Sequence, residues 1–395
     1  MTNSVVRIAL GWAAFSLIAA PVLAQQPAGR RAGGAARRAG IEGRWNITVT
    51  EGQSTYPSWL GVVNKDGKLE ATFLGRAGGV GGTEAFKFEN NTVSFKAHGR
   101  EWTGKLDGNT LEGTAKNKDG EVKWVGKRSI PRVDLSGKWI VGDNKATLTL
   151  AQNGRELSGT WEQGGKKTEI ADVRRFGRNL RFTVDGRRYQ AVGKGDVMEI
   201  ESQGDQLTAR RVREWGEPVE LFNGKPEDLE NWEPLGGSGQ FHWKVVDGVL
   251  TNGGHGTENI VTKRKDFRNF KLHVEFKVPE HGNSGVYLRG RHEVQIADSY
   301  GRPIEAGGCG AMYSRVLPKV NASKPAGEWQ TYDIVFVDNF LTVVHNGQLI
   351  MDNVEVEGIT GGAIDSNEWE PGPIYLQGDH SQIFYRKVIL TPAKE

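Results

Sequence analysis

The chain is poor in cysteine, since Cys309 is the only one among its 395 residues. A single cysteine cannot form an intrachain disulfide, and it cannot supply the cysteine pairs of a structural zinc site. The fold must therefore depend on its hydrophobic core. Glycines flank this cysteine in "GGCGAMY", which favours a tight backbone position for a small residue over a catalytic nucleophile.

Net charge is low as well. The formal charge is +3, and the basic excess lies in "QQPAGRRAGGAARRAG", which contains arginines but no acidic residue. A nucleic-acid-binding protein is expected to have a basic folded domain and not only a basic tail, so we expect no nucleic-acid partner. The basic segment, residues 25–41, is most simply a solvated linker, and contact with an envelope partner is the alternative.

Long apolar runs are missing except near the N-terminus. Arg7 precedes an apolar run at residues 8–20, and the small-residue segment "VLA" follows it. A transmembrane helix needs about 20 apolar residues, so this shorter run predicts a signal peptide at 1–24 and no membrane span. We therefore expect an exported protein, either periplasmic or secreted.

Apolar residues with a helical period are also missing, whereas the chain has 54 glycines and 12 tryptophans. This composition is typical of short strands joined by tight turns, and it predicts an all-β fold. The length that remains after the signal peptide is sufficient for two or three domains.

Two segments before residue 215 resemble each other. "GRWNITV" and "GKWIVGD" each place a tryptophan early in a strand, and a hairpin follows each one, with Asp66-Gly67 or Asn153-Gly154 at its turn. These residue types suit the positive φ angles of such turns. We predict two small antiparallel β modules, 42–131 and 132–215, built as sandwiches or barrels. Their tryptophans either fill small cores, which we favour, or form platforms for sugars.

A third domain is predicted at residues 216–395. Seven of the eight histidines lie in this part of the chain, and segments such as "FKLHVEFKV" and "HEVQIAD" alternate apolar with polar residues. Such alternation is typical of strands. Its length and strand pattern predict a two-sheet jelly roll whose concave sheet can hold a ligand.

Two of these strands expose carboxylates. Glu275 lies on the polar side of "FKLHVEFKV", and Glu293 and Gln295 lie on the polar side of "HEVQIAD", with Arg289 shortly before them. Two carboxylates that face a common site can act as acid and base, or as nucleophile and acid, in glycoside cleavage. The same alternation also occurs in any antiparallel sheet with one solvated face.

Several segments of the third domain occur in the order found in a known family. They are "ELFNGKPEDLENWE", "WKVVDGVLTN", "NSGVYLRG", "HEVQIADSYG", "GAMYSR", "KPAGEWQTYDIVF", "NGQLI" and "GPIYLQGDHSQIFYRKVIL". Through these motifs the domain resembles the 3-keto-disaccharide hydrolase family. The resemblance implies a concanavalin-like β-sandwich that hydrolyses glycosides whose sugar carries a ketone at C3. The two N-terminal modules lie outside it.

The chemistry of such a substrate suggests roles for the polar residues, which the family motifs themselves do not assign. A C3 ketone acidifies the hydrogen at C2, so a base can remove that hydrogen and expel the C1 oxygen before water adds back. This route needs a base, an acid and donors for the enolate. Glu275 or Glu293 is expected to be the base and the other the acid or a binding group. Arg289 would stabilise the enolate, with a surface ion pair to Glu293 as the alternative, and Asn283 and Gln295 would hold sugar hydroxyls.

Three further residues complete the expected substrate site. The family motifs cover Asp298, which has the parity of Val294 and reaches the polar side only if the strand ends or bulges; otherwise it caps a turn. His380 follows Asp379 and is interpreted as a base, a metal ligand or part of a turn. Trp369, in the polar loop "SNEWEPGP", is a candidate sugar platform.

No cofactor is predicted. The histidines and acids allow a divalent metal, but no H-x-H or H-E-x-x-H spacing is present, so the metal ligands are unknown. The hypothesis is an exported glycoside hydrolase that takes a 3-keto-glycoside or 3-keto-disaccharide as substrate and acts by base-assisted elimination and hydration. One alternative is a lectin-like, carbohydrate-binding envelope protein on the same fold. The other is an envelope interaction protein that acts through its small modules.

Overall fold

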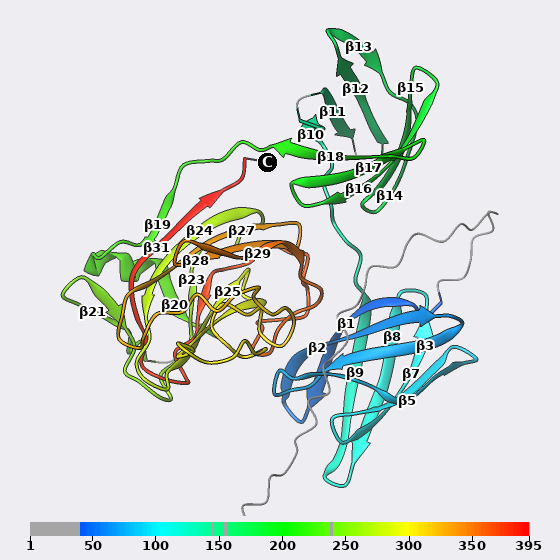
Figure 1. The fold of residues 1–395 in the computed structure, drawn as a ribbon. Helices are drawn as coiled ribbons and strands as arrows, with labels where there is room; N and C mark the ends of the chain where they lie inside the picture. The colour runs from blue at the N-terminus through cyan, green and yellow to red at the C-terminus, as the bar shows by residue number, and fades with distance from the viewer. Residues whose placement is uncertain (1–39, 144, 154–155, 238–239, 395) are drawn as a thin grey trace, which may run out of the picture. The chain divides into compact units, whose positions relative to one another are not determined.

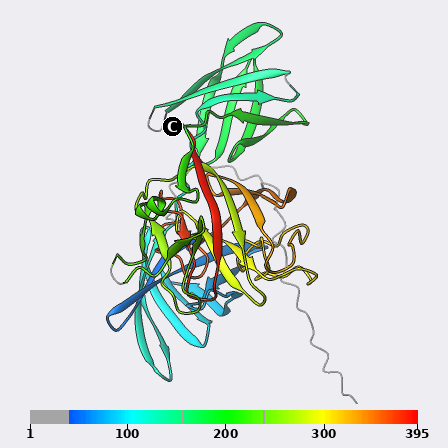
Figure 2. The same ribbon diagram turned by 90° about the vertical axis from the view of Figure 1, so that its left-hand side faces the viewer.

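The computed structural model describes residues 40–394 except 144, 154–155 and 238–239, and its fold is all-β (Figures 1 and 2). The predicted signal peptide and nearly all of the predicted linker lie outside the described residues. Within the described part of the chain, no helix is both long enough and apolar enough to cross a membrane.

The first antiparallel sheet has nine strands in the order β4-β3-β2-β1-β9-β8-β7-β6-β5. Its strands are β1 (Gly43–Glu51), β2 (Ser54–Lys65), β3 (Lys68–Leu74), β4 (Val80–Gly82), β5 (Glu84–Glu89), β6 (Thr92–Ala97), β7 (Arg100–Asp107), β8 (Thr110–Asn117) and β9 (Gly120–Arg128). Figure 1 shows this sheet, blue to cyan, curling around its own interior. Trp45, Trp102 and Trp124 are buried in the core that fills this interior.

The second sheet repeats the same strand order as β13-β12-β11-β10-β18-β17-β16-β15-β14. Its strands are β10 (Gly137–Val141), β11 (Ala146–Asn153), β12 (Glu156–Gln163), β13 (Lys166–Glu169), β14 (Ala171–Phe176), β15 (Asn179–Val184), β16 (Arg187–Lys194), β17 (Val197–Ser202) and β18 (Asp205–Val212). Trp139 and Trp161 are buried in its core. The interpretation of the module tryptophans as core residues is therefore confirmed.

Asx-Gly pairs form the hairpin turns that the sequence predicts. Asp66 and Gly67 have φ angles of 52° and 88°, and Asn346 and Gly347 have φ angles of 49° and 79°. Two consecutive positive φ angles are the signature of the type I′ turn, which matches the twist of the strands that it joins. The predicted turn at Asn153-Gly154 lies partly outside the described residues.

The C-terminal domain has two sheets that enclose one core. The larger has the order β21-β22-β31-β24-β27-β28-β29 with β19 paired to β31, and the smaller has the order β20-β23-β30-β25-β26. The elements are β19 (Val219–Phe222), the 3-10 helix η1 (Pro226–Asn231), β20 (Trp232–Pro234), β21 (Lys244–Val246), β22 (Val249–Thr251), β23 (Ile260–Thr262), β24 (Phe270–Lys277), β25 (Asn283–Leu288), β26 (His292–Ala297), β27 (Gln330–Val337), β28 (Phe340–His345), β29 (Gln348–Glu355), β30 (Tyr375–Leu376) and β31 (Phe384–Pro392). Val274 and Phe336 of the larger sheet share a core cluster with Val294 and Ile296 of the smaller one. The predicted all-β sandwich class is therefore confirmed.

Cys309 lies within this core. It is buried, and its thiol lies 3.0 Å from the hydroxyl of Tyr332. Burial raises the pKa of the thiol, and the interaction with Tyr332 only partly offsets this rise. The expected tight position for a small residue is confirmed.

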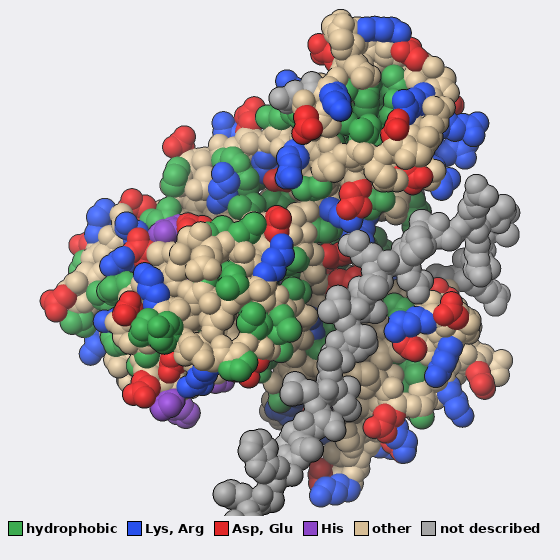
Figure 3. All heavy atoms as spheres, viewed as in Figure 1, with side chains coloured by type: hydrophobic (Ala, Val, Ile, Leu, Met, Phe, Trp, Pro, Cys, Tyr) green, Lys and Arg blue, Asp and Glu red, His purple; other side chains and the backbone are tan. Residues whose placement is uncertain are grey.

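Charged side chains of both signs are interspersed on the face of the molecule shown in Figure 3, over the residues that the structure describes. Neighbouring strands form surface ion pairs such as Lys65–Glu70 at 2.6 Å and Lys96–Glu101 at 2.7 Å. Exposed pairs of this kind contribute little to stability, because water and salt screen them. The buried cores therefore carry most of the stability.

Candidate active site

The hairpin of β25 and β26 has one apolar face and one polar face. Val294 points into the sandwich core. On the opposite side, Tyr287 lies opposite Glu293 and Gly285 lies opposite Gln295, and directly paired residues of antiparallel strands project to the same side. The alternation expected for "HEVQIAD" therefore places Glu293 and Gln295 together, away from the core.

The short strand β30 adds to this side of the sheet. Tyr375 lies opposite Tyr287 in the register, and their rings stack with centroids 4.1 Å apart. The backbone N–H of Gln377 donates to the carbonyl oxygen of Gly285 at 3.0 Å. We call the following residues the polar face: Gly285, Tyr287, Glu293, Gln295, Tyr375 and Gln377.

The carboxyl group of Glu293 lies across Gly285 on the polar face. A Cβ atom at residue 285 would lie 2.3 Å from Oε1 of Glu293, so only glycine leaves room for this carboxyl group. Glu293 is 3 % exposed, and its burial raises its pKa to about 8, although an interaction with the Tyr287 hydroxyl lowers it and the charge of Asp379 raises it further. A carboxyl group with this pKa is largely protonated at neutral pH and can both donate and accept a proton.

Two tyrosine hydroxyls adjoin this carboxyl group. Burial raises the pKa of both Tyr287 and Tyr375, and the charge of Glu293 acts in the same direction. Both hydroxyls therefore stay protonated at neutral pH, and each has one hydrogen to donate. The hydroxyl of Tyr287 donates to the carbonyl oxygen of Gly361 at 2.8 Å, which holds the 361 segment against the polar face.

Two amide oxygens of the polar face have no hydrogen-bond partner within the described part of the chain. They are Oε1 of Gln295 and Oε1 of Gln377, and both residues are buried. The Nε2 atom of Gln295 donates to the carbonyl oxygen of Gly307 at 3.2 Å, which fixes the orientation of that amide. A buried acceptor without a partner costs free energy, and each of these oxygens is suited to accept a hydroxyl group of a bound sugar.

An exposed rim adjoins the polar face beyond Gln377. The side chains of Asp379 and His380 are 44 % and 49 % exposed, and Oδ1 of Asp379 lies 2.6 Å from Nδ1 of His380. The amide of Asn259 donates to Oδ2 of Asp379 at 3.3 Å. Asn283, at the start of β25, donates its backbone N–H to the hydroxyl of Ser381 at 2.8 Å. The rim therefore brings the Asp379–His380 pair and the start of β25 to the edge of the polar face.

The domain that carries the polar face is similar to known proteins. Residues 217–391 match the family model of the 3-keto-alpha-glucoside-1,2-lyase-like domain. The resemblance that the sequence motifs predicted is confirmed at the predicted place in the chain. Among curated proteins, none matches the chain.

Two solved structures similar to the lyase-like domain come from Parabacteroides distasonis, and each is provisionally assigned as a glycosyl hydrolase. One is 29 % identical, covers 45 % of this chain and 90 % of its own, and has a TM-score of 0.38. The other is 23 % identical, covers 44 % of this chain and 93 % of its own, and has a TM-score of 0.35. A third structure, an endo-β-1,3(4)-glucanase of family GH16, is 10 % identical over 46 % of this chain and 91 % of its own, with a TM-score of 0.31.

Glu275 does not lie on the polar face of the lyase-like domain. It belongs to β24 of the larger sheet, whereas Glu293 belongs to β26 of the smaller sheet, so the common face expected for the two carboxylates is not formed. The carboxylate of Glu275 contacts Arg386, His273 at 3.2 Å and Lys387 at 3.3 Å. Burial works against ionisation, but these partners hold the pKa of Glu275 below its usual value. We interpret it as part of a surface ion-pair network.

Arg289 points away from Glu293. Its guanidinium lies 4.4 Å from the ring centroid of Phe336 in the larger sheet and donates to the side chain of Asn339. Burial, together with the charge of Arg291, lowers its pKa to about 9. The side chain therefore lies between the two sheets, and neither the expected enolate contact nor the alternative ion pair with Glu293 is formed.

Asp298 and Trp369 also lie apart from the polar face. The carboxylate of Asp298 accepts the backbone N–H of His281 at 3.0 Å, so it caps the turn before β25, which is not the turn at Tyr300-Gly301 that the sequence offers as the alternative. The indole N–H of Trp369 donates to the hydroxyl of Ser129 at 3.1 Å, and its ring packs on the core of the second sheet. Neither geometry places the side chain against a sugar bound at Glu293.

Three residues of the polar face, Tyr287, Tyr375 and Gln377, are not predicted from the sequence. A signal was present, because Tyr375, Gln377 and Asp379 have the same parity in "IYLQGD", but β30 is too short for its alternation to identify a strand. Within the described residues, no group of three or more His, Cys, Asp or Glu side chains is arranged to hold a metal ion. The divalent metal that the sequence allows therefore has no assigned ligands.

Proposed function

We propose that the lyase-like domain cleaves glycosides whose sugar carries a ketone at C3, and that Glu293 transfers the proton at C2. The observation that carries the proposal is the buried carboxyl group of Glu293, whose pKa of about 8 lies close to neutral pH. A general acid–base group is most effective when its pKa is near the working pH. The family match supports a keto-glycoside as the substrate class.

The reaction follows from the acidity that the ketone confers on C2. Deprotonated Glu293 takes the C2 hydrogen, the electrons of that bond form an enolate with the ketone, and the enolate expels the C1 oxygen to leave a C1=C2 double bond. His380, paired with Asp379 on the rim, donates a proton to the departing oxygen. Water then adds at C1 and a proton returns to C2, so the products are the alcohol and the free 3-keto-sugar. The sum of these steps is a hydrolysis, without net oxidation or reduction.

The remaining residues of the polar face bind the substrate in this proposal. The hydroxyl of Tyr375 donates to the enolate oxygen, where such a donor has its greatest effect on the barrier. The amide oxygens of Gln295 and Gln377 accept sugar hydroxyls, and the side chain of Asn283 contacts the sugar at the rim. Glu275 and Arg289 take no part.

The test compares alcohol release from a methyl 3-keto-glucoside and from the unoxidised methyl glucoside. We expect release from the keto-glucoside alone, and a loss of at least about 100-fold in the Glu293→Gln variant, since general acid–base groups typically contribute that much. Glu275→Gln is the matched control, because it makes the same chemical change in the other sheet. In D₂O, the product should carry deuterium at C2.

Equal turnover of the unoxidised glucoside, or product without deuterium at C2, would refute the elimination route. Saturable sugar binding without turnover, unaffected by Glu293→Gln, would favour the lectin-like alternative. We further propose that the protein is exported to the periplasm or secreted. This second proposal rests on the signal-peptide pattern of the sequence and is tested by N-terminal sequencing of the mature chain.

A further inference from the structure

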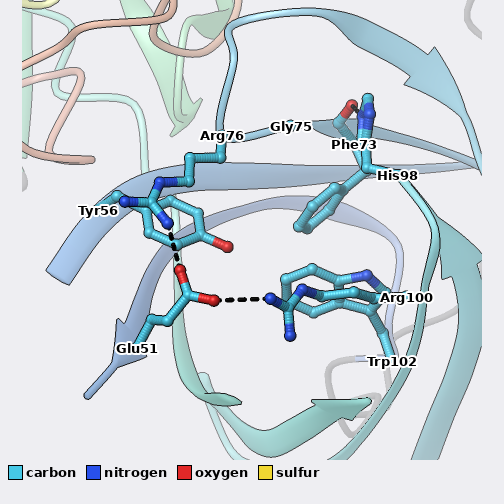
Figure 4. A pocket seen from close by; sticks show the side chains of 8 residues that line it. All are labelled: Glu51, Tyr56, Phe73, Gly75, Arg76, His98, Arg100 and Trp102. Carbon is cyan, nitrogen blue, oxygen red and sulfur yellow. Dashed lines mark hydrogen bonds and ion pairs between the residues drawn. The ribbon is translucent and has the colours of Figure 1, made fainter. Parts of the chain in front are cut away.

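We propose that the first module holds a second ligand site, which binds the carboxylate of an acidic sugar. The site is a cavity of about 100 Å³ in the sheet β1–β9 (Figure 4). Its lining residues are Glu51, Tyr56, Phe73, Gly75, Arg76, His98, Arg100 and Trp102. The module lies outside residues 217–391, so the family match assigns it no activity.

The floor of the cavity is apolar. The rings of Phe73 and Trp102 lie 4.5 Å apart between centroids, and both side chains are buried in the module core. His98 packs beside them over Gly75, where a Cβ atom would lie 2.7 Å from the imidazole ring. The volume is equivalent to about three water molecules. It therefore has room for a carboxylate and its attached carbon, with the rest of a sugar ring lying toward solvent.

The rim of the cavity is cationic. The carboxylate of Glu51 contacts both Arg76 and Arg100, the latter at 2.7 Å, so two guanidinium groups share a single acid. Figure 4 shows both guanidinium groups converging on this carboxylate. The excess of one positive charge favours a ligand with one negative charge.

One N–H group of the Arg100 guanidinium has no acceptor among the described residues. Nη1 of Arg100 is buried and has no hydrogen-bond partner among the described residues, while Nη2 of the same guanidinium donates to Glu51. A buried donor without an acceptor costs free energy, and a carboxylate oxygen is the acceptor that a guanidinium binds most strongly. The Arg100 guanidinium therefore makes fewer hydrogen bonds than its geometry allows.

The strand order alone does not produce this cavity, because the second module has the same strand order with a shorter first hairpin. Both sheets have the same strand order, but β1 and β2 have 9 and 12 residues, whereas β10 and β11 have 5 and 8. Each strand of the first hairpin is therefore four residues longer. That extension carries Glu51 and, opposite Val49, Tyr56. Among the described residues of the second module, β10 and β11 have no such extension.

Arg187 begins β16 as Arg100 begins β7, and it lies over Tyr189. Its guanidinium donates to Ser202 at 2.7 Å and also contacts Asp205. No acid like Glu51 is shared with a second arginine there. Arg187 therefore serves as a matched control for Arg100 in the same fold.

The choice of a sugar carboxylate over an acidic peptide rests on the proposed function of the C-terminal domain. An enzyme that acts on glycosides gains effective concentration when a linked module binds the same polysaccharide. The cavity has room for the carboxylate at C6 and its attached carbon, and Arg76 and Arg100 on the rim suit that carboxylate. The ligand class is therefore a uronate residue of an acidic polysaccharide.

The experiment measures binding of methyl β-glucuronide and methyl β-glucoside to the full chain by isothermal titration calorimetry. We expect the glucuronide to bind at least tenfold more tightly than the glucoside. Arg100→Gln should abolish this preference, and Arg187→Gln should leave it unchanged. Glu51→Gln should strengthen glucuronide binding severalfold, because it removes the internal competitor for both arginines, and a gain of affinity cannot arise from misfolding.

Equal affinity for the two glycosides would overturn the proposal, as would a glucuronide affinity that Arg100→Gln leaves unchanged or that Glu51→Gln weakens. Tighter binding of an aspartate-containing peptide than of the glucuronide would overturn the assignment to a sugar. Turnover of a soluble 3-keto-glucoside should be the same in the Arg100→Gln variant and the wild type. Failure of this site is therefore distinguishable from failure of the proposed enzyme activity.

Discussion

Replacement of Glu293 by glutamine should make the β25–β26 hairpin more stable at alkaline pH. The pKa of Glu293 is about 8 in the folded chain, against 4.5 for an ordinary glutamate. Because the folded state holds the proton more tightly, this group stabilises the fold at low pH, and that contribution is lost as the pH rises toward 8. Integration of the linkage relation between pH 5 and pH 8 gives a loss on the order of 3–4 kcal/mol. Glutamine carries no such loss.

The assay is amide hydrogen exchange of peptides from β25 and β26, measured at pH 5 and pH 8 on the full wild-type chain and on the Glu293→Gln variant. Comparison at the same pH cancels the intrinsic exchange rate, and the free energy of local opening follows from the protection. The variant should gain roughly 3–4 kcal/mol relative to the wild type between the two pH values.

Glu275→Gln is the control, because the pKa of Glu275 is lowered and not raised. Burial favours its neutral form, but Arg386, His273 and Lys387 outweigh that effect. Its ion pairs therefore stabilise the fold above an ordinary glutamate pKa and are lost only as the pH falls below it. The difference between Glu275→Gln and wild type should stay nearly constant from pH 5 to pH 8. A constant difference for Glu293→Gln as well would show that Glu293 is ionised in the folded state, and the reasoning would fail.

Three further outcomes follow from the same contacts. Gly285→Ala should cost at least tenfold in turnover of a 3-keto-glucoside and roughly 1–3 kcal/mol in stability measured by urea unfolding, because its Cβ atom would displace the Glu293 carboxyl; retention of full activity would contradict the position assigned to that carboxyl. Tyr287→Phe removes the interaction that lowers the pKa of Glu293, so the acidic limb of the pH–rate profile should move to higher pH, whereas an unmoved limb would separate Glu293 from the rate. Cys309 should react with iodoacetamide only after unfolding, since burial raises its pKa and thiolate is the reactive form; mass spectrometry of the native chain should find it unmodified.

The fold class follows from local signals in the sequence. Turn residues such as Asp66-Gly67 and Asn346-Gly347 specify where hairpins reverse, because few residue types tolerate positive φ. Alternation then specifies which side chains of each strand face the core. Both kinds of signal are local in the sequence, so they can be recognised without knowledge of the tertiary structure.

The site depends on information that such signals do not contain. Alternation places both Glu275 and Glu293 on solvent-facing sides of their strands, but it does not report that these strands belong to different sheets. Nearness in sequence predicts Arg289 beside Glu293. In the structure Arg289 has a positive φ of 53°, and its side chain lies against Phe336. Pairing between distant strands and the direction of a side chain at a turn are set by the packing of the whole domain.

The β1–β2 hairpin of the first module is longer than its counterpart in the second module, yet the core residues of both hairpins keep the same pairing. Side chains alternate between the two faces of a strand with a period of two, so an insertion of odd length would turn every following residue to the wrong face. An extension of four residues in each strand leaves Trp45 and Leu60 paired toward the interior, as Trp139 and Leu148 are in the second module. A hairpin of this fold can therefore lengthen without turning its core residues outward when both strands grow by the same number of residues, and every two residues added to each strand supply one new inward pair.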